Sequence, residues 1–438
     1  MKSVALAIDE PSPRGIASGI ARLITSGDLA PGDRLPTVRA LAADLGVSPA
    51  TVSHAWQTLS AAGLIVTRGR SGSIVRSAPR EWLPLRYRGL DGAADARLDL
   101  SRGTPDPALL PNLARALSRV SEHAQTTSYQ LKPDIPQLHD YLRESWPTPV
   151  ESLTVTNGAL DAIDRSLAHL VRFGDRVIIE NPTFPPFFDL IEHYGLEPVP
   201  VDLDEQGMRP DQFLRATTRD PAVVLLQPRA QNPTGTSMTM ERAADLARIL
   251  RRSRNQRIVV IEDDHSGSIT TAADVSLAIW LPERVLHVRS YSKSHGPDLR
   301  IGALGGSRSL VDPIVARRLL GPGWTARMVQ VMLLDLLTDP QSVAEVASAR
   351  DAYGQRQADL ARELAAHGIE MRAGDGINAW LSVRDERSAM VSLAAAGISV
   401  APGGPFQLGG SPHLRVTVGA ITRDVPTIAT ALAAAAIA

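Results

Sequence analysis

Three polar side chains that could act together in chemistry each follow a short apolar run in the second half of the chain. They are Asn232, Asp263 and Lys293, in that order. A lysine amine can form a Schiff base with a carbonyl compound, and a carboxylate can hold a proton on a ring nitrogen. Lysine is rare here, since only three of the 46 basic residues are lysines. The excess of arginine is typical of a GC-rich genome, but the position of Lys293 needs its own explanation.

Residues beside Lys293 are suited to a phosphate dianion. Ser290 and Ser292 lie just before it, and Arg300 follows in a largely apolar segment. A turn at Gly158 leads into a predicted helix, whose free N–H groups favour an anion. An amine, a phosphate site and an acid for a ring nitrogen are the groups that pyridoxal phosphate requires. Taken alone, Lys293 could be a solvated surface residue, but the ordered set favours the cofactor.

The apolar runs predict the sheet that positions these groups. Six runs are typical of buried strands, with amphipathic helices between the earlier ones: 153–156, 177–180, 222–227, 257–262, 285–289 and 301–305. This alternation predicts an α/β unit with a mainly parallel sheet covered by helices. Ligands of such sheets bind at the carboxyl ends of the strands, where the polar residues described above lie.

The first eighty residues follow a different pattern. Helical spacing begins near Ile16, after Thr37 and after Ser48, and two short β-type runs follow. A glycine-rich tip carrying Arg68 and Arg70 joins these runs, so the pattern predicts a winged helix-turn-helix. This region holds nine basic and five acidic residues in a chain of net charge −1, which indicates a nucleic-acid contact. The alternative is a three-helix packing unit without a ligand.

Composition excludes several classes of protein. The chain has 438 residues, 44% apolar and 21% charged, which indicates a globular protein of two or three domains. The absence of cysteine excludes disulfides, thiolate metal sites and cysteine nucleophiles, and favours a cytoplasmic location. The apolar runs are too short for a bilayer span, and the start is too short for a signal peptide. We expect no metal site and no membrane contact.

The N-terminal pattern resembles a known family. The run GDLAPGDRLPTVRALAADLGVSPATV, with the glycine-rich wing that follows, resembles the DNA-binding domain of GntR-type bacterial regulators. The resemblance implies that one set of side chains contacts a double-stranded DNA operator: Arg39, Ser48, Thr51, Ser53, Arg68 and Arg70. The family often has an arginine after the serine of the third helix, where this chain has Pro49.

Residues 98–438 resemble a class I aminotransferase domain of fold type I. The resemblance implies that Lys293 is the Schiff-base lysine and that Asp263 pairs with the pyridinium nitrogen of the cofactor. Asn232, in an Asn-Pro-Thr-Gly motif, would bond the ring hydroxyl, and Arg415 would bind a substrate carboxylate in a bidentate manner. A small subdomain would comprise about 98–126 and 308–438.

The same resemblance assigns the remaining cofactor contacts. The phosphate would be held by Gly158, Ala159, Ser290, Ser292 and Arg300, and by Tyr129 from the neighbouring subunit. Phe184 would stack on the ring. The family usually has a tyrosine near the ring hydroxyl, where this chain has His265. Histidine can still bond the ring oxygen, but it titrates near neutrality.

The order of the two units resembles one subgroup, the MocR-type regulators. We expect a tail at 1–11, a winged helix-turn-helix at 12–78, a linker at 79–97 and the aminotransferase-like domain at 98–438. The resemblance implies a cytoplasmic homodimer whose two DNA-binding units contact two half-sites. Our leading hypothesis is a regulator that senses an amine, an amino acid or the cofactor itself. The alternatives are a working aminotransferase with a DNA-binding appendage and a dimerisation scaffold without pyridoxal phosphate.

Overall fold

The computed structural model describes most of the chain in two compact units, an N-terminal unit before Arg86 and a large unit that holds most of the rest. The residues described are 4–5, 7–8, 10–61, 64–67, 72–75, 86, 96–123 and 132–438. The wing tip at 68–71 and most of the predicted linker lie outside them. Within these ranges, no helix combines the length and the apolar character that crossing a membrane requires.

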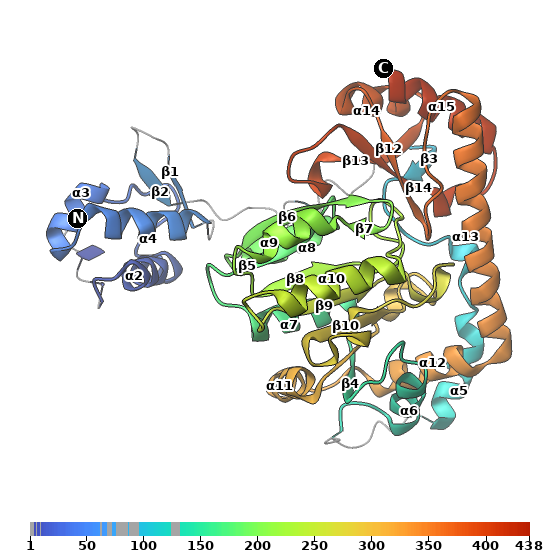
Figure 1. Ribbon diagram of the computed structural model, residues 1–438, viewed down its shortest axis with the longest axis horizontal. Coiled ribbons are helices and arrows are strands. Elements are labelled where there is room, and N and C mark those ends of the chain that lie inside the picture. Colours follow the sequence, from blue (N-terminus) through green and yellow to red (C-terminus); the bar gives the residue numbers. More distant parts are fainter. Residues whose placement is uncertain are drawn as a thin grey trace. The chain divides into compact units, whose positions relative to one another are not determined.

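In the part of the N-terminal unit that the structure describes, helices α2, α3 and α4 accompany a two-stranded sheet (Figure 1). The elements of this part are α2 (Pro13–Ser26), α3 (Val38–Leu45), α4 (Pro49–Ala61), β1 (Ile65–Thr67) and β2 (Ser73–Val75). Ser12 and Thr37 cap α2 and α3 by accepting backbone N–H bonds, and Gly27 and Gly46 end these helices in the left-handed region. The winged helix-turn-helix predicted from the sequence is confirmed.

An eight-stranded sheet forms the centre of the large unit. Its order is β4 (Ser152–Thr156), β11 (Gly302–Gly306), β10 (Val285–Ser290), β9 (Val259–Asp264), β8 (Val223–Leu226), β5 (Arg176–Asn181), β6 (Glu197–Asp204) and β7 (Gly207–Met208). Strands β5, β8, β9 and β10 are parallel. The mainly parallel sheet is therefore confirmed, with all six predicted strands in it.

Strand β11 is antiparallel to both of its neighbours. A parallel return needs a crossover of a dozen or more residues, usually with a helix. The connection from Ser290 to Gly302 contains only a 3-10 turn at Pro297–Leu299. The short connection therefore reverses the strand, and it carries Lys293 and Arg300 across the carboxyl end of the sheet.

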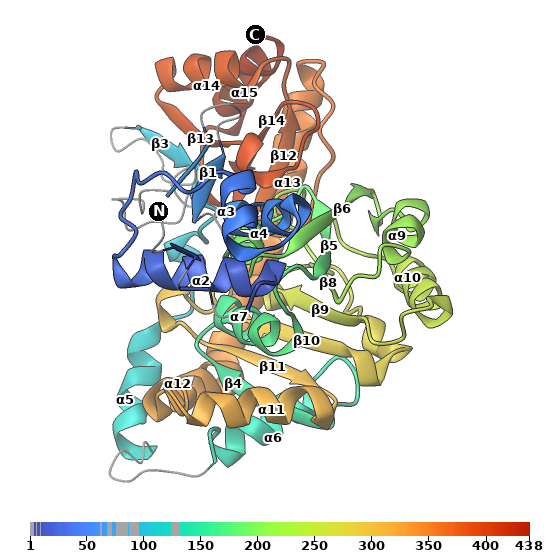
Figure 2. The same cartoon turned by 90° about the vertical axis from the view of Figure 1, so that its left-hand side faces the viewer.

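Helices cover both faces of this sheet. In Figure 2, α9 (Pro210–Thr217) and α10 (Met240–Arg252) lie on one side of β5, β8 and β9, and α7 (Ala159–Leu170) lies on the other. The side chains of α9 and α10 share one apolar core with Ile178 and Val224 of the strands. Further helices are α5 (Leu113–His123), α6 (Pro136–Glu144), α8 (Pro185–His193), α11 (Arg308–Leu319), α12 (Arg327–Thr338) and α13 (Pro340–Ala366).

A second sheet of the large unit joins strands that are far apart in the sequence. Its order is β12 (Asn378–Ser382), β14 (His413–Thr417), β13 (Ile398–Pro402) and β3 (Leu98–Leu100). Helices α14 (Glu386–Ala395) and α15 (Val425–Ile437) pack on it, and α13 runs past it along one side of the unit (Figure 1). The bounds of about 98–126 and 308–438 for a small subdomain stay a prediction.

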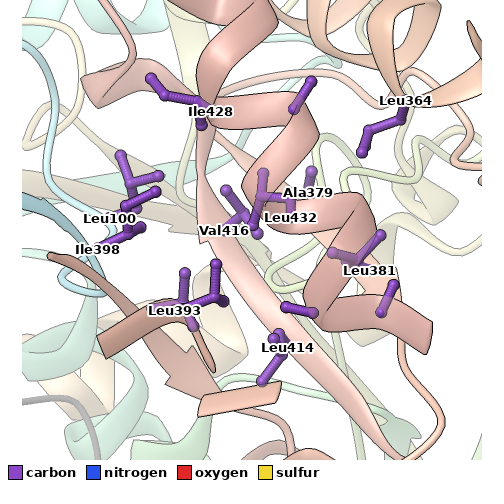
Figure 3. Close-up of a cluster of buried hydrophobic side chains, with 14 of the residues drawn as sticks. Leu100, Leu364, Ala379, Leu381, Leu393, Ile398, Leu414, Val416, Ile428 and Leu432 are labelled. Carbon is purple, nitrogen blue, oxygen red and sulfur yellow. The ribbon is translucent and has the colours of Figure 1, made fainter. Parts of the chain in front are cut away.

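The packing of the second sheet determines the face of β14 on which the side chain of Arg415 lies. Leu414 and Val416 of β14 are fully buried in the apolar cluster that α15 covers (Figure 3). Successive side chains of a strand point to opposite faces. Arg415 therefore points away from this cluster, on the face where β3 leads into the segment 101–103.

Candidate functional site

Lys293 lies in the turn after β10, and its side chain reaches the segment that follows β3. Its amino group donates a hydrogen bond to the main-chain oxygen of Gly103 at 2.5 Å. Burial lowers the pKa of Lys293 to about 8, and the positive charges of Arg415 and Arg300 act in the same direction. A larger share of the amine is therefore neutral near neutral pH, which is the form that attacks a carbonyl carbon.

Asp263 lies near the carboxyl end of β9 and is buried. Its Oδ2 accepts a hydrogen bond of 2.8 Å from the side-chain amide of Gln227. Among the residues that the structure describes, its Oδ1 has no hydrogen-bond partner. Burial raises the pKa of Asp263 to about 7. A buried carboxyl with one free oxygen fits an N–H group of an aromatic ring, since that contact would satisfy the oxygen.

The turn before α7 lies close to the guanidinium group of Arg300. Gly158 has a φ of +93° and precedes the first turn of the helix, whose N–H groups favour negative charge. A Cβ atom at Gly158 would lie 2.7 Å from a guanidinium nitrogen of Arg300, so only glycine allows this approach. Ser290, at the end of β10, accepts a bond from the N–H of Ser292 at 3.3 Å. These groups suit a phosphate dianion.

Asn232 and Phe184 follow β8 and β5 respectively. The backbone N–H of Asn232 donates to the side-chain oxygen of Gln227 at 2.9 Å. In the described part of the chain, its own Oδ1 is buried without a partner. Phe184 is half-buried and makes an edge-to-face contact with Phe187, with 5.5 Å between ring centroids. The Oδ1 atom of Asn232 and the ring of Phe184 could therefore both contact a ligand.

His265 differs from the sequence-based expectation. Its Nε2 lies 2.9 Å from the main-chain oxygen of Ala230, and its Nδ1 lies 3.2 Å from the hydroxyl of Ser266. Nε2 therefore carries the hydrogen, because the carbonyl can only accept. Burial, with the positive charge of Lys293, lowers the pKa of His265 to about 4. The expectation that His265 titrates near neutrality is wrong, since a buried imidazolium loses its hydration.

Arg415 is a buried cation, 1% exposed, with no ion pair to any described residue. One guanidinium nitrogen donates to the main-chain oxygen of Ser101, and the group lies 4.9 Å from the ring centre of Phe406. Its Nε has no partner among the described residues. Burial lowers the pKa of Arg415 to about 9. A carboxylate would supply the opposite charge and the planar contact that this group lacks.

Three charged side chains act on the amino group of Lys293. Arg300 comes from the same turn as Lys293, whereas Asp263 comes from β9 and Arg415 from β14. Tyr129 lies outside the described residues. In the ranges that the structure covers, no group of three or more His, Asp or Glu side chains is placed to hold a metal ion.

Helix α4 presents the candidate DNA contacts of the N-terminal unit. Ser48 accepts the backbone N–H of Thr51 at 3.2 Å, and the two hydroxyl oxygens lie 2.8 Å apart. Ser53 is half-buried, whereas Arg39 of α3 is exposed. Arg68 and Arg70 of the wing lie outside the described residues.

Two exposed residues of α4 are missing from the sequence-based set. Val52, Ala55 and Leu59 are buried, so His54 and Gln57 point away from the core and are exposed. The same 3.6-residue spacing is readable in the sequence, and it could have identified both residues. In the large unit, sequence reasoning missed Gln227 and Gly103, for which no motif gave a signal.

Comparisons with known proteins agree with this architecture. Residues 96–432 match the family described as Aminotransferase class I and II, and residues 14–75 match the Bacterial regulatory proteins, gntR family. The chain belongs to the HTH-type transcriptional regulators that join a GntR domain to an aminotransferase class I and II domain, the MocR type.

Two curated relatives cover nearly the same length. The vitamin B6 salvage pathway transcriptional repressor PtsJ of Salmonella typhimurium is 34% identical, over 96% of this chain and 98% of its own. The HTH-type transcriptional regulator TauR of Rhodobacter capsulatus is 28% identical, over 87% of each chain. Both resemble this chain across the two domains.

Solved structures confirm the fold of the large unit. The α-aminoadipate aminotransferase LysN of Thermus thermophilus, complexed with N-(5'-phosphopyridoxyl)-L-leucine, has a TM-score of 0.70 and 21% identity, and covers 80% of this chain and 95% of its own. Aspartate aminotransferase of Thermus thermophilus has a TM-score of 0.68 and 21% identity, over 81% of this chain and 100% of its own. The large unit therefore has the predicted fold type I.

Proposed function

We propose that this chain is a DNA-binding transcriptional regulator that holds pyridoxal phosphate on Lys293 and responds to a small amine, an amino acid or the cofactor itself. One observation carries the proposal. The amino group of Lys293 and the guanidinium group of Arg415 both bond to main-chain oxygens of the segment 101–103. The aldehyde of pyridoxal phosphate would take the amino group of Lys293 away from that segment, and the carboxylate of an amino acid would compete with the segment for Arg415.

The residues present fit the cofactor. The free Oδ1 of Asp263 would accept the ring N–H, and Asn232 would face the ring hydroxyl. Gly158 leaves space for the guanidinium group of Arg300 at the start of α7, where the phosphate would bind. The remaining proposed contacts are those of Ala159, Ser290, Ser292, Phe184 and His265, with Tyr129 of a second subunit.

When bound, pyridoxal phosphate supplies an aldehyde that condenses with amines and a ring that withdraws electrons. The residues of this chain prepare the site for that chemistry. The lowered pKa of Lys293 supplies neutral amine, and the Oδ1 of Asp263 would accept a hydrogen bond from the protonated ring nitrogen. Nε2 of neutral His265 donates to the main-chain oxygen of Ala230. Its other ring nitrogen, Nδ1, lies near the hydroxyl group of Ser266.

The named function of a relative suggests the class of effector. PtsJ, which is 34% identical, is named a repressor of a vitamin B6 salvage pathway. We extend this to the present chain and propose that a B6 vitamer is the first effector to test. Pyridoxal phosphate would then be both the ligand of Lys293 and the signal.

The segment 101–103 would carry the signal to the DNA-binding unit. It follows β3, the first strand after the predicted linker, and β3 pairs with β13 in the second sheet. A ligand that takes Lys293 and Arg415 releases two hydrogen bonds to this segment. The position of β3 would change, and with it the end of the predicted linker. Such coupling requires that the ligand binds the two arrangements with different affinity.

We propose that the regulator works as a homodimer. Leu117 of α5, Leu320 after α11 and Met328 of α12 are 54%, 81% and 50% exposed. Large apolar side chains at such exposure favour a contact with another chain. Leu320→Glu should give monomers in sedimentation at concentrations where the wild type is dimeric. Monomeric wild type, or a dimeric variant, would contradict this contact.

We propose that α4 enters the major groove of an operator. Ser48, Thr51 and Ser53 lie toward its first turns, and His54 and Gln57 lie on its outer face. A glutamine amide can make two bonds to adenine. Exposed Arg39, with Arg68 and Arg70, would contact phosphates.

A working aminotransferase is the second candidate. Two groups favour it: Oδ1 of Asp263 suits the ring nitrogen of the cofactor, and Arg415, which has no ion pair to any described residue, suits the carboxylate of an amino-acid substrate. The replacement of the usual tyrosine by His265 argues against it. Steady conversion of an amino acid and a keto acid, at rates usual for aminotransferases, would favour this candidate over the sensor.

The deciding experiment is a spectral titration of the purified full chain with pyridoxal phosphate, followed by amines and amino acids. We expect a visible absorption band in the wild type and in Lys132→Ala, and none in Lys293→Ala. Amino acids that bind at Arg415 should then change the band. A wild type whose spectrum equals that of Lys293→Ala would contradict cofactor binding.

A further inference from the structure

Gln227 is a buried residue directly after β8. It is not among the residues proposed to contact the cofactor, so its role needs a separate explanation. Its side chain is 3% exposed. It lies between two of those residues, since its amide nitrogen contacts Asp263 and its amide oxygen contacts Asn232. Neither of the two residues next to Gln227 in the sequence makes this pair of side-chain contacts.

The hydrogen bonds determine the orientation of the Gln227 amide. Its Nε2 donates to Oδ2 of Asp263 at 2.8 Å, and its Oε1 accepts the backbone N–H of Asn232 at 2.9 Å. A carboxylate can only accept and an N–H can only donate, so the amide has one possible orientation. Because Oδ2 is taken, Oδ1 is the oxygen of Asp263 left for a ligand.

A second acid lies behind Gln227. Oε2 of Glu180 accepts the backbone N–H of Gln227 at 3.0 Å and the side chain of Gln231 at 3.3 Å. Burial raises the pKa of Glu180 to about 8. Both oxygen-bonded neighbours of Glu180 belong to the network, whereas Oδ1 of Asp263 has no partner among the described residues, so Asp263 is the carboxyl that can face a ligand.

We propose that Gln227 is a positioning residue that aims Oδ1 of Asp263 and the side chain of Asn232 at the cofactor ring, with Glu180 holding the backbone N–H of Gln227. This inference rests on the proposed function. Without the amide donor, the carboxyl group of Asp263 can rotate about its side-chain bonds. Either of its two oxygens could then face the ligand. The ring nitrogen would then lose its fixed partner, although the phosphate site would be unchanged.

Four variants of the full chain separate this role from general stability. Gln227→Leu removes both side-chain bonds, and Gln227→Met removes them with an unbranched side chain of similar length. Glu180→Gln keeps the shape and the neutral state. Gln357→Leu is the matched control, because Gln357 is 1% exposed and bonds to Gly376 and Asn378 instead.

The readouts are the affinity for pyridoxal phosphate and the pH midpoint of the visible band, with circular dichroism as a check of folding. We expect both Gln227 variants to bind about tenfold more weakly and to shift the midpoint. Glu180→Gln and Gln357→Leu should keep the wild-type midpoint.

Two results would overturn the inference separately from the proposed function. A wild type that gains a visible band, with folded Gln227 variants that keep its midpoint and affinity, would overturn this inference alone. A shift in Gln357→Leu as large as in Gln227→Leu would also overturn it, because the effect would then be general. A wild type without any band would overturn the proposed function and this inference with it.

Discussion

The amino group of Lys293 donates a hydrogen bond to the main-chain oxygen of Gly103, with 2.5 Å between nitrogen and oxygen. The two residues are 190 positions apart in the chain. Gly103 also lies against the guanidinium group of Arg415. One short segment after β3 therefore contacts both cations of the candidate site, and we propose that a ligand there affects DNA binding through this segment.

Gly103→Ala should weaken amino-acid binding without affecting pyridoxal phosphate. Gly103 has a φ of +60°, and a Cβ atom there would lie 2.9 Å from a guanidinium nitrogen of Arg415, so this group must move. We expect amino acids to bind about tenfold more weakly in a spectral titration, because a charged hydrogen bond is lost. Gly368→Ala is the control, since Gly368 has a φ of +77° and open space around its Cβ position. Equal effects of both variants would refute the role of Gly103.

Arg415→Met should raise the pKa of Lys293. The positive charge of Arg415 is one cause of the lowered value of about 8, so its removal favours the ammonium form. The rate of association with pyridoxal phosphate, measured against pH, should reach its midpoint at a higher pH than in the wild type. Arg415→Lys keeps the charge and should keep the midpoint. The prediction fails if the midpoint of Arg415→Met equals that of the wild type.

Glu180→Gln should stabilise the chain at pH 8 and leave its stability at pH 4 unchanged. In the unfolded chain Glu180 ionises near its ordinary value of 4.5, whereas burial raises its pKa in the folded chain to about 8. Folding therefore costs free energy above pH 4.5, and this cost rises to a few kcal/mol, an order-of-magnitude figure, by about pH 8. Thermal unfolding at both pH values checks this. A gain of equal size at pH 4 would show a different cause.

Arg39→Ala and Gln57→Ala should affect operator binding in different ways. Loss of a phosphate contact at Arg39 should lower affinity for every sequence and reduce the salt slope by about one. Gln57→Ala should keep the slope and lose about 1–3 kcal/mol of preference at one base pair. Fluorescence anisotropy with the protein's own upstream DNA, and with point variants of it, measures both. Arg423→Ala, an exposed arginine of the large unit, is the control. An unchanged slope in Arg39→Ala would count against this contact.

The sequence predicted the elements because their signals are local. Helical spacing, caps at Thr37 and Gly46, and apolar runs are all readable within a few residues. Because Asp263 and Lys293 end or follow apolar runs, the sequence also placed them at strand ends. Ligands of a parallel sheet bind at these ends.

The remaining features depend on contacts between distant segments. The pairing of β3 with β13 and the bond from Lys293 to Gly103 join parts of the chain that no local pattern relates. The titration expected for His265 was wrong because burial in the folded chain decides its pKa. Gln227 looks like any polar residue at a strand end until both of its partners are placed.

We propose that a ligand of Lys293 controls DNA binding. The affinity of the full chain for its own upstream DNA tests this proposal when it is measured with and without saturating pyridoxal phosphate, in the wild type and in Lys293→Ala. We predict that pyridoxal phosphate changes the affinity of the wild type and leaves that of Lys293→Ala unchanged. Equal affinities of the wild type under both conditions, or an effect that Lys293→Ala retains, would show that no ligand of Lys293 controls DNA binding.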